Sequence, residues 1–325
     1  MTMRRLSCIA VLCTLAAPAL AHDIDLHHLP LGDGKISHAP KVGFIWACHI
    51  DPFGGGAQRD GPWIDKKDGT FDLTAKIAVR GSLRWPHRFT VTREGGTRVL
   101  NSNDLPDHPT GRFPVAPDDP AFRYDRNPNH IERQNMRVEL PANPKLAARP
   151  HCAPGVVGIL LTGVALFNAL DAPGRDALAH ETQDRCRGHP QQGGVYHYHS
   201  LTNCIDDRPG SDGNSPLVGY ALDGFGIYGS YAGGKQLASA DLNACHGMTS
   251  VIDWDGRKVK MYHYVATADF PYTVGCLRGD YDRELVRVIG GPPPGRMGLG
   301  RLGFGGPRRP PPGMRPPPYG APPPR

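Results

Sequence analysis

Residues 188–199 read Gly-His-Pro-Gln-Gln-Gly-Gly-Val-Tyr-His-Tyr-His. The Tyr-His-Tyr-His end repeats with a period of two, and tyrosine favours β-strands. Residues two apart on a strand point to the same face, with Cα atoms about 6.6–6.8 Å apart. We therefore expect His197 and His199 to project side by side, with Tyr196 and Tyr198 packed on the opposite face.

Two imidazoles on one face can converge on a metal ion, and several residues could supply a third ligand. The candidates are His189 in the same stretch, His263 and Asp223, and the neighbouring acidic residues Glu181 and Asp184 add support to the metal hypothesis. Asp223 lies in a glycine-flanked bend, where the alternative is that it only caps the backbone. Imidazole-rich sets suit zinc, copper or iron. The alternative for the histidine pair is a hydrogen-bonded pair buried under tyrosines.

A second Tyr-His-Tyr occurs at residues 262–264, on the return strand of a hairpin predicted over residues 251–265 with Asp-Gly at its turn. Val265 stands where the first motif has His199. His263 is therefore a third strand histidine that could approach the first two.

The N-terminus predicts export. Arg4 and Arg5 precede an apolar stretch, and Ala19-Leu20-Ala21 is a small-x-small cleavage site. Residues 1–21 are thus expected to be a signal peptide and residues 22–40 a polar leader, so the protein is secreted or periplasmic. No later run is long enough to cross a bilayer.

The mature chain keeps an even number of cysteines, which in an exported protein predicts disulfides. Six cysteines allow 15 pairings, and we expect Cys186–Cys204, Cys245–Cys276 and Cys48–Cys152. Thiolate metal ligation is the alternative, but the chain has no Cys-x-x-Cys pair.

The formal charge of +6 is concentrated at the ends of the chain. Residues 290–325 hold six arginines and no acidic residue, and Arg4 and Arg5 lie in the signal. The remainder carries 29 basic against 31 acidic residues and so has no bias towards nucleic acid. The Pro/Gly/Arg-rich tail is expected to be disordered. Contact with anionic envelope surfaces and simple solubilisation are both open roles for it.

Short alternating segments separated by turn residues predict a mainly β, sandwich-like single domain over residues 41–289, with long irregular loops and disulfides. A turn or two of helix is expected within residues 171–184. Strands are expected at residues 42–48, 71–80, 89–93, 135–140 and 217–222, and two more, joined at Thr162-Gly163, within residues 156–170.

Two classes of function follow from these residues. The first is metal binding by the histidines, with or without catalysis. The second is a carbohydrate- or peptide-binding or structural module with an aromatic platform, for which the candidate residues are Tyr196, Tyr198, Phe225, Tyr228, Tyr262 and His108. A serine or cysteine hydrolase is disfavoured, because no Gly-x-Ser-x-Gly elbow is present and the cysteines are expected to be paired. The absence of a His-Glu-x-x-His helix removes the commonest metalloprotease pattern, while hydrolysis by a metal-bound water at an open position stays an option.

The chain resembles the YHYH domain family between about residues 61 and 279. The segments that carry this resemblance are Leu105–Pro114, Cys186–His189, Tyr196–His199, Cys204, Asp223–Phe225, Ile227–Gly229, Tyr262–Tyr264 and Phe270–Tyr272. The resemblance implies an exported or surface-associated domain. It assigns no catalytic residues, so it implies fold and export more than activity.

Overall fold

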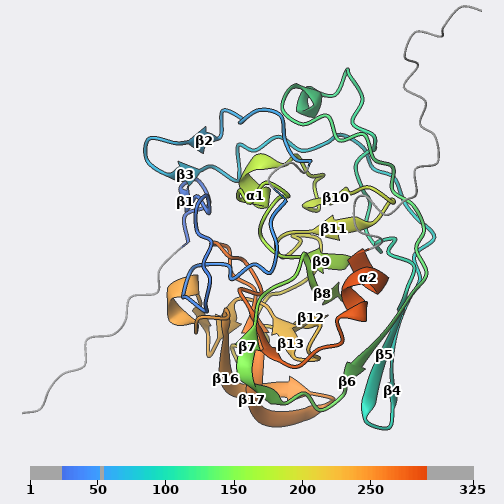
Figure 1. Ribbon diagram of the computed structural model, residues 1–325, viewed down its shortest axis with the longest axis vertical. Helices are drawn as coiled ribbons and strands as arrows, with labels where there is room; N and C mark the ends of the chain where they lie inside the picture. The colour runs from blue at the N-terminus through green and yellow to red at the C-terminus, as the bar shows by residue number, and fades with distance from the viewer. Residues whose placement is uncertain (1–23, 52–54, 291–325) are drawn as a thin grey trace, which may run out of the picture. The chain divides into compact units, whose positions relative to one another are not determined.

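Eight strands from residues 156–265 form the main sheet of the computed structural model, which describes residues 24–51 and 55–290. Their order across the sheet is β10-β11-β9-β8-β12-β13-β17-β16, as Figure 1 shows. The strands are β8 (Val156–Leu160), β9 (Ala165–Phe167), β10 (Gly188–Pro190), β11 (Tyr196–Tyr198), β12 (Leu217–Ala221), β13 (Gly226–Tyr228), β16 (Gly247–Trp254) and β17 (Arg257–Val265).

The middle of this sheet is the core of the domain. Every residue of β8 is buried, as expected for a strand covered on both faces. Gly158 lets β12 approach closely, because a Cβ at this position would lie 2.4 Å from the carbonyl oxygen of Tyr220. The predicted pair of core strands within residues 156–170 is confirmed as β8 and β9.

Smaller sheets surround the main one. The antiparallel sheet β4-β5-β6 includes a hairpin whose turn has Gly95 at φ 62°, and it confirms the strands predicted at residues 89–93 and 135–140. The remaining strands pair as β1-β3-β2, β14-β15 and β18-β7. The bounds of the strands in these sheets are β1 (Leu29–Pro30), β2 (Ile64–Asp65), β3 (Thr70–Phe71), β4 (Phe89–Glu94), β5 (Thr97–Ser102), β6 (Met136–Pro141), β7 (Leu146–His151), β14 (Tyr231–Ala232), β15 (Lys235–Gln236) and β18 (Leu277–Gly279).

Helices are short among the described residues. They are η1 (Pro120–Arg123), α1 (Ala177–His180), η2 (Ser239–Asp241) and α2 (Glu284–Gly290). The α1 helix begins at Asp176, whose side chain accepts a hydrogen bond from the Ala179 amide, and it ends at Glu181. In the described part of the chain, no helix has the length and hydropathy needed to cross a membrane.

All three predicted disulfides are present. The Cα–Cα distances are 4.9 Å for Cys48–Cys152, 5.3 Å for Cys186–Cys204 and 4.5 Å for Cys245–Cys276. Cys186 precedes β10 and Cys204 follows β11, so this disulfide closes the two ends of the β10-β11 hairpin. The mainly β, disulfide-bonded class is confirmed.

Two strand predictions are wrong. Residues 42–48 contribute only isolated bridges, Ile36 with Ile45 and Ala47 with Ala153. In residues 71–80 the strand ends at Phe71, because the carboxylate of Asp72 accepts hydrogen bonds from the amides of Thr74 and Ala75 and turns the chain.

The predicted signal peptide and nearly all of the Pro/Gly/Arg-rich tail lie outside the described residues, as do the first two residues of the leader.

Candidate metal centre

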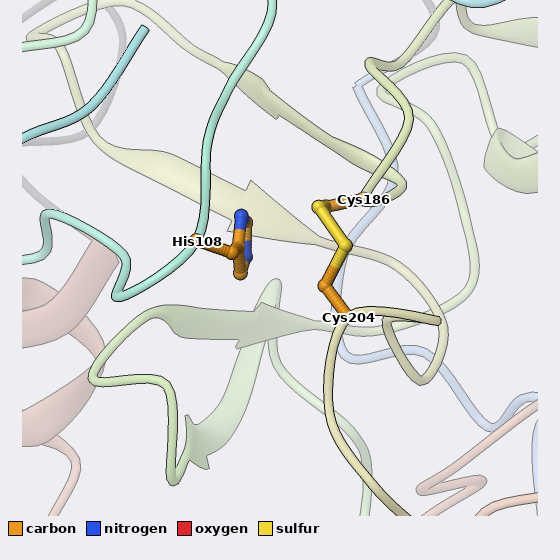
Figure 2. A group of neighbouring side chains, drawn as sticks. All are labelled: His108, Cys186 and Cys204. Atoms are coloured by element: carbon orange, nitrogen blue, oxygen red, sulfur yellow. A yellow bond between two sulfur atoms is a disulfide. The ribbon is translucent and has the colours of Figure 1, made fainter. Parts of the chain in front are cut away.

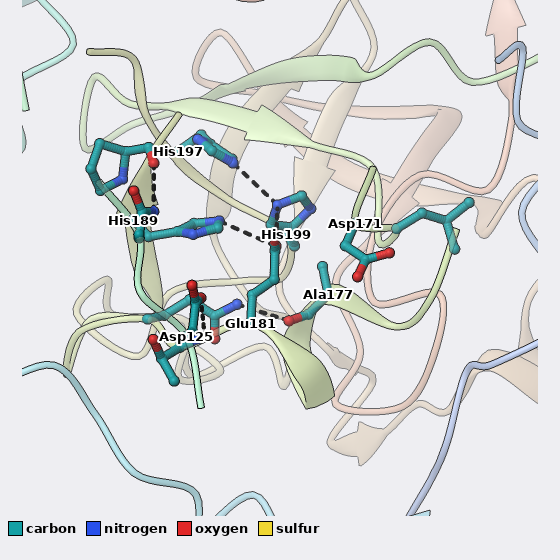
Figure 3. Close-up of polar contacts among 12 residues, drawn as sticks. Asp125, Asp171, Ala177, Glu181, His189, His197 and His199 are labelled. Atoms are coloured by element: carbon teal, nitrogen blue, oxygen red, sulfur yellow. Dashed lines mark hydrogen bonds and ion pairs between the residues drawn. The ribbon is translucent and has the colours of Figure 1, made fainter. Parts of the chain in front are cut away.

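The β10-β11 hairpin brings a third histidine to the predicted pair. In this antiparallel pairing His189 lies directly opposite His197. Directly opposite residues project to the same face, so His189 joins the face on which His197 and His199 already lie. Of the three candidates for a third ligand, His189 is the one that the structure places beside them (Figure 3).

The three imidazoles form a tight, buried cluster. One ligand nitrogen from each ring lies within 4.8 Å of the other two. The ring centroids are 4.5 Å apart for His189 and His197, 4.9 Å for His197 and His199, and 5.4 Å for His189 and His199. Each residue is at most 4% exposed, so these nitrogens are shielded from bulk solvent. From β9, the Phe167 ring packs 4.2 Å from that of His197.

The hydrogen bonds of two rings fix their tautomers. Nδ1 of His199 lies 2.6 Å from the carbonyl oxygen of Asn168, and Nδ1 of His197 lies 3.2 Å from that of Val195. A carbonyl only accepts, so each Nδ1 carries the hydrogen and each Nε2 carries a lone pair. These two Nε2 atoms face each other at 3.1 Å. Two lone pairs at this distance repel unless a cation lies between them.

Glu181, at the C-terminal end of α1, completes the group. Its Oε2 lies 3.4 Å from Nε2 of His189 and 3.3 Å from Nε2 of His199. This oxygen is buried and has no hydrogen-bond partner, and neither ring nitrogen of His189 has one. Buried polar atoms without a protein partner are uncommon, and they can mark the position of a water molecule or an ion.

Burial sets the charge state of the cluster in the absence of a metal. It lowers the pKa of His189 and His197 well below the ordinary value, with a further lowering from neighbouring rings, and it lowers the pKa of His199 to about 4. Burial, reinforced by the nearby Asp125 and Asp171, raises the pKa of Glu181 well above its ordinary value. Without a metal the three rings are therefore kept neutral and Glu181 is kept protonated, whereas a bound divalent cation would displace that proton and be partly balanced by the resulting carboxylate.

The tyrosines of the motif face away from the cluster and anchor loops. The Tyr196 hydroxyl donates to the Asp184 carboxylate at 2.7 Å. The Tyr198 hydroxyl lies 2.6 Å from Nε2 of His108, whose Nδ1 lies 3.0 Å from the carbonyl oxygen of Pro109. Asp184 is thus committed to the tyrosine face, and His108 ties residues 105–114 to β11.

His108 also lies beside the Cys186–Cys204 disulfide (Figure 2). Both sulfurs are covalently paired and offer no thiolate, so this group is not a metal site as it stands.

The other residues of the predicted aromatic platform are buried as well. Phe225, Tyr228 and Tyr262 are each at most 5% exposed. The Phe225 and Tyr262 rings pack edge to face at 5.2 Å, and the Tyr228 hydroxyl donates to the carbonyl of Asp253. These rings contribute to the core and present no exposed surface to a carbohydrate or peptide.

Two predicted metal ligands do not reach the cluster. His263 lies on β17, separated from β11 by β9, β8, β12 and β13, which at about 4.8 Å per strand is roughly 24 Å. The Asp223 carboxylate accepts hydrogen bonds from the Tyr264 hydroxyl at 2.6 Å and from the Gly279 and Arg278 amides at 2.9 and 3.1 Å. It therefore braces β18 against the sheet.

These features define the class of the protein: a disulfide-bonded, mainly β domain with a buried three-histidine, one-glutamate cluster. Residues 137–236 match the family described as "YHYH protein", which supports the resemblance drawn from the motifs. The match contains the whole cluster and ends before the second Tyr-His-Tyr. No curated protein and no solved structure matches the chain.

Proposed function

We propose that this is an exported protein that binds one transition-metal ion, zinc being the best suited, through His189, His197 and His199 with Glu181 as the fourth ligand. The observation that carries the proposal is the pair of lone-pair nitrogens of His197 and His199 at 3.1 Å, with a partnerless carboxylate oxygen of Glu181 3.3 Å from that of His199. Export is supported by the three disulfides, which persist in oxidising compartments.

The distances between donor atoms fit a tetrahedral ion. Zinc–nitrogen bonds are about 2.0–2.1 Å, so the edge of a zinc-centred tetrahedron is about 3.3–3.4 Å. Three of its six edges are close to this length, at 3.1 Å for His197–His199, 3.3 Å for His199–Glu181 and 3.4 Å for His189–Glu181, and the nitrogens of all three rings lie within 4.8 Å of one another. Small shifts would therefore complete the coordination.

The outer contacts also suit a metal site. Ligating histidines usually donate their second ring N–H to a carbonyl or carboxylate, which fixes the ring and makes the ligating nitrogen more basic. His197 and His199 do this through the carbonyls of Val195 and Asn168. The site is also closed, because four buried protein groups surround it, and closed four-ligand sites are structural rather than catalytic.

In this role the metal would join three separate parts of the fold. His189 comes from β10, His197 and His199 come from β11 and the residue after it, and Glu181 comes from the end of α1. Coordination would thus fasten the connection between β9 and β10 onto the hairpin that it precedes.

The test is the metal content of the purified mature protein by plasma mass spectrometry. The wild type is expected to hold close to one equivalent of zinc, copper or iron, and a His197→Ala/His199→Ala variant close to none. His263→Ala is the matched control, because it removes a buried histidine from an equivalent Tyr-His-Tyr strand and should keep the metal. A folded wild type that stays empty after incubation with each of the three metals would refute the proposal.

A further inference from the structure

The main sheet is built from two halves with the same plan. Residues 156–199 give the order β10-β11-β9-β8, and residues 217–265 give β12-β13-β17-β16, which is the same order reversed. In each half an antiparallel hairpin comes first along the chain, the next strand takes the sheet edge, and the last strand inserts between them, parallel to the second hairpin strand. Figure 1 shows the two halves meeting at β8 and β12.

The register at the junction is that of a twofold axis. Ile159 pairs with Tyr220, and on either side Gly158 pairs with Ala221 while Leu160 pairs with Gly219. Exchanging the two halves leaves this set of pairs unchanged, with Gly158 equivalent to Gly219.

The β8-β9 and β12-β13 hairpins also have a register shift at the same position. In the first half Val156 pairs with Phe167 and Gly158 with Leu166, and the register shifts between them. In the second half Leu217 pairs with Tyr228 and Gly219 with Ile227, with the same shift.

The outer strands match residue for residue. Gly188 pairs with Tyr198 and His189 with His197 in the first half. Gly247 pairs with Tyr264 and Met248 with His263 in the second.

The loops that lead into the edge strands also match. The side-chain oxygen of Asp184 accepts from the amides of Cys186 and Gly188 at 2.8 and 3.3 Å. That of Asn243 accepts from Cys245 and Gly247 at 2.9 and 3.3 Å. The residue between cysteine and glycine is left-handed in both, with φ 62° at Arg187 and φ 66° at His246, and both cysteines form disulfides.

We propose that the domain is an internal duplication and that its second half holds a metal position which has been converted to apolar packing. His263 is the equivalent of His197 and keeps the same local contact, with Nδ1 3.4 Å from the carbonyl of Met261, two residues earlier. Met248 stands in place of His189 and Val265 in place of His199.

The converted position shows what the metal would do in the first half, an argument that rests on the function proposed above. Val265 forms an apolar cluster with Leu237 and Leu242, against which Met248 packs. Leu237 and Leu242 lie in the connection from β13 to β16, as Glu181 lies in the connection from β9 to β10. Both halves thus fasten this connection onto the last hairpin, one through ligands and the other through side-chain packing, so the metal acts as a structural fastener.

Restoring the missing ligands tests the duplication. Met248→His/Val265→His places three imidazoles in the second half, and zinc per chain is counted by plasma mass spectrometry after zinc incubation and gel filtration. The variant is expected to bind one more equivalent than the wild type. Met248→Gln/Val265→Thr, equally polar but without imidazoles, should show no increment. An unchanged zinc count in the folded variant would overturn the inference.

The wild-type count and the increment answer separate questions. A wild type that stays empty of zinc, copper and iron would refute the proposed function, whereas the difference in zinc content between the two proteins reports on the second half alone.

If Met248→His/Val265→His does not fold, the reciprocal exchange tests whether the two positions are equivalent. In His189→Met/His199→Val, the first half carries the apolar residues that the second half has at the equivalent positions. We expect this variant to be metal-free and to melt at a higher temperature than His189→Ala/His199→Ala. A melting temperature at or below that of the alanine variant would show that the two positions are not equivalent.

Discussion

Replacing Glu181 with glutamine should change zinc affinity and metal-free stability in opposite directions. Glutamine has nearly the same shape, so the substitution removes the charge and keeps the packing. Among the described residues, the Glu181 carboxylate is the only anionic group in an ion-pair contact with this cluster of imidazoles. Loss of a merely supporting group costs 10- to 100-fold in metal affinity. Loss of this charge should cost at least about 100-fold, which corresponds to about 2.7 kcal/mol.

Without metal, the same substitution should stabilise the folded protein. Burial raises the pKa of Glu181 well above the 4.5 of the unfolded chain. Between these two pKa values the folded protein binds more protons than the unfolded one, so wild-type stability falls as the pH rises through this window, by about 1.4 kcal/mol per pH unit. Glu181→Gln has no such proton to lose. In a chelator, its free energy of unfolding should exceed that of the wild type, and the gap should widen from pH 4.5 upwards.

Urea unfolding in chelator at pH 5 and pH 6.5 measures the stability difference, and competition with a chromophoric chelator measures zinc affinity. Glu139→Gln is the control, because this exposed glutamate on β6 should change neither quantity. Unchanged zinc affinity in Glu181→Gln would remove Glu181 from the ligand set. A stability gap that does not grow with pH would refute the electrostatic account of its burial.

Three further measurements follow from the structure. Burial lowers the pKa of His246 to about 3. Its neutral ring therefore contributes to the stability of the folded protein in full above pH 6.5, and this stability is lost as the pH falls below that value. Asparagine tolerates the left-handed backbone at this position. In urea titrations, the free energy of unfolding of His246→Asn should therefore rise by about 2 kcal/mol relative to that of the wild type when the pH is lowered from 7.5 to 5. Cys186→Ser/Cys204→Ser opens a disulfide of sequence separation 18. It should lose about 3 kcal/mol in the same assay, and equal stability would contradict this. Chelation should lower the wild-type Tm by about 5–10 °C, for zinc at 100 times its Kd. It should leave that of His189→Met/His199→Val unchanged.

Sequence patterns predicted the features of the fold that depend on residues close together in the chain, such as strand faces and hairpin turns. The alternation in residues 196–199 placed both histidines on one face, and Asp255-Gly256 marked the turn of the β16-β17 hairpin. Residues 71–80 show the limit of this reasoning. Their alternation is that of a strand, but the Asp72 side chain offers the backbone amides a local acceptor that competes with strand pairing.

The choice of the third ligand could not be made from local pattern. His189, His263 and Asp223 were equally available along the chain. They are separated only by the order of strands in the sheet, which depends on pairings between distant segments. Glu181 was noticed only as a nearby acidic residue, because its approach to the rings depends on where α1 docks. The recurrence of Tyr-His-Tyr was visible in the sequence, and it suggested that the histidines of both copies share one site. The structure instead places the two copies at equivalent positions in the two halves of the main sheet, on opposite sides of the twofold axis between β8 and β12.

Comparison of the two halves separates the roles of tyrosine and histidine in the motif. The tyrosines occur in both halves and each reaches a polar partner: Tyr196 reaches Asp184, Tyr262 reaches Asn243 and Tyr264 reaches Asp223. They fix loops to the sheet whether or not ligands are present. Of the histidine positions, only that of His197 and His263 is kept, and the other two carry methionine and valine where a hydrophobic cluster is available. The tyrosines therefore hold loops to the sheet in both halves, and under the function proposed above the histidines on the opposite face distinguish a half that would hold a metal from one that packs through apolar side chains.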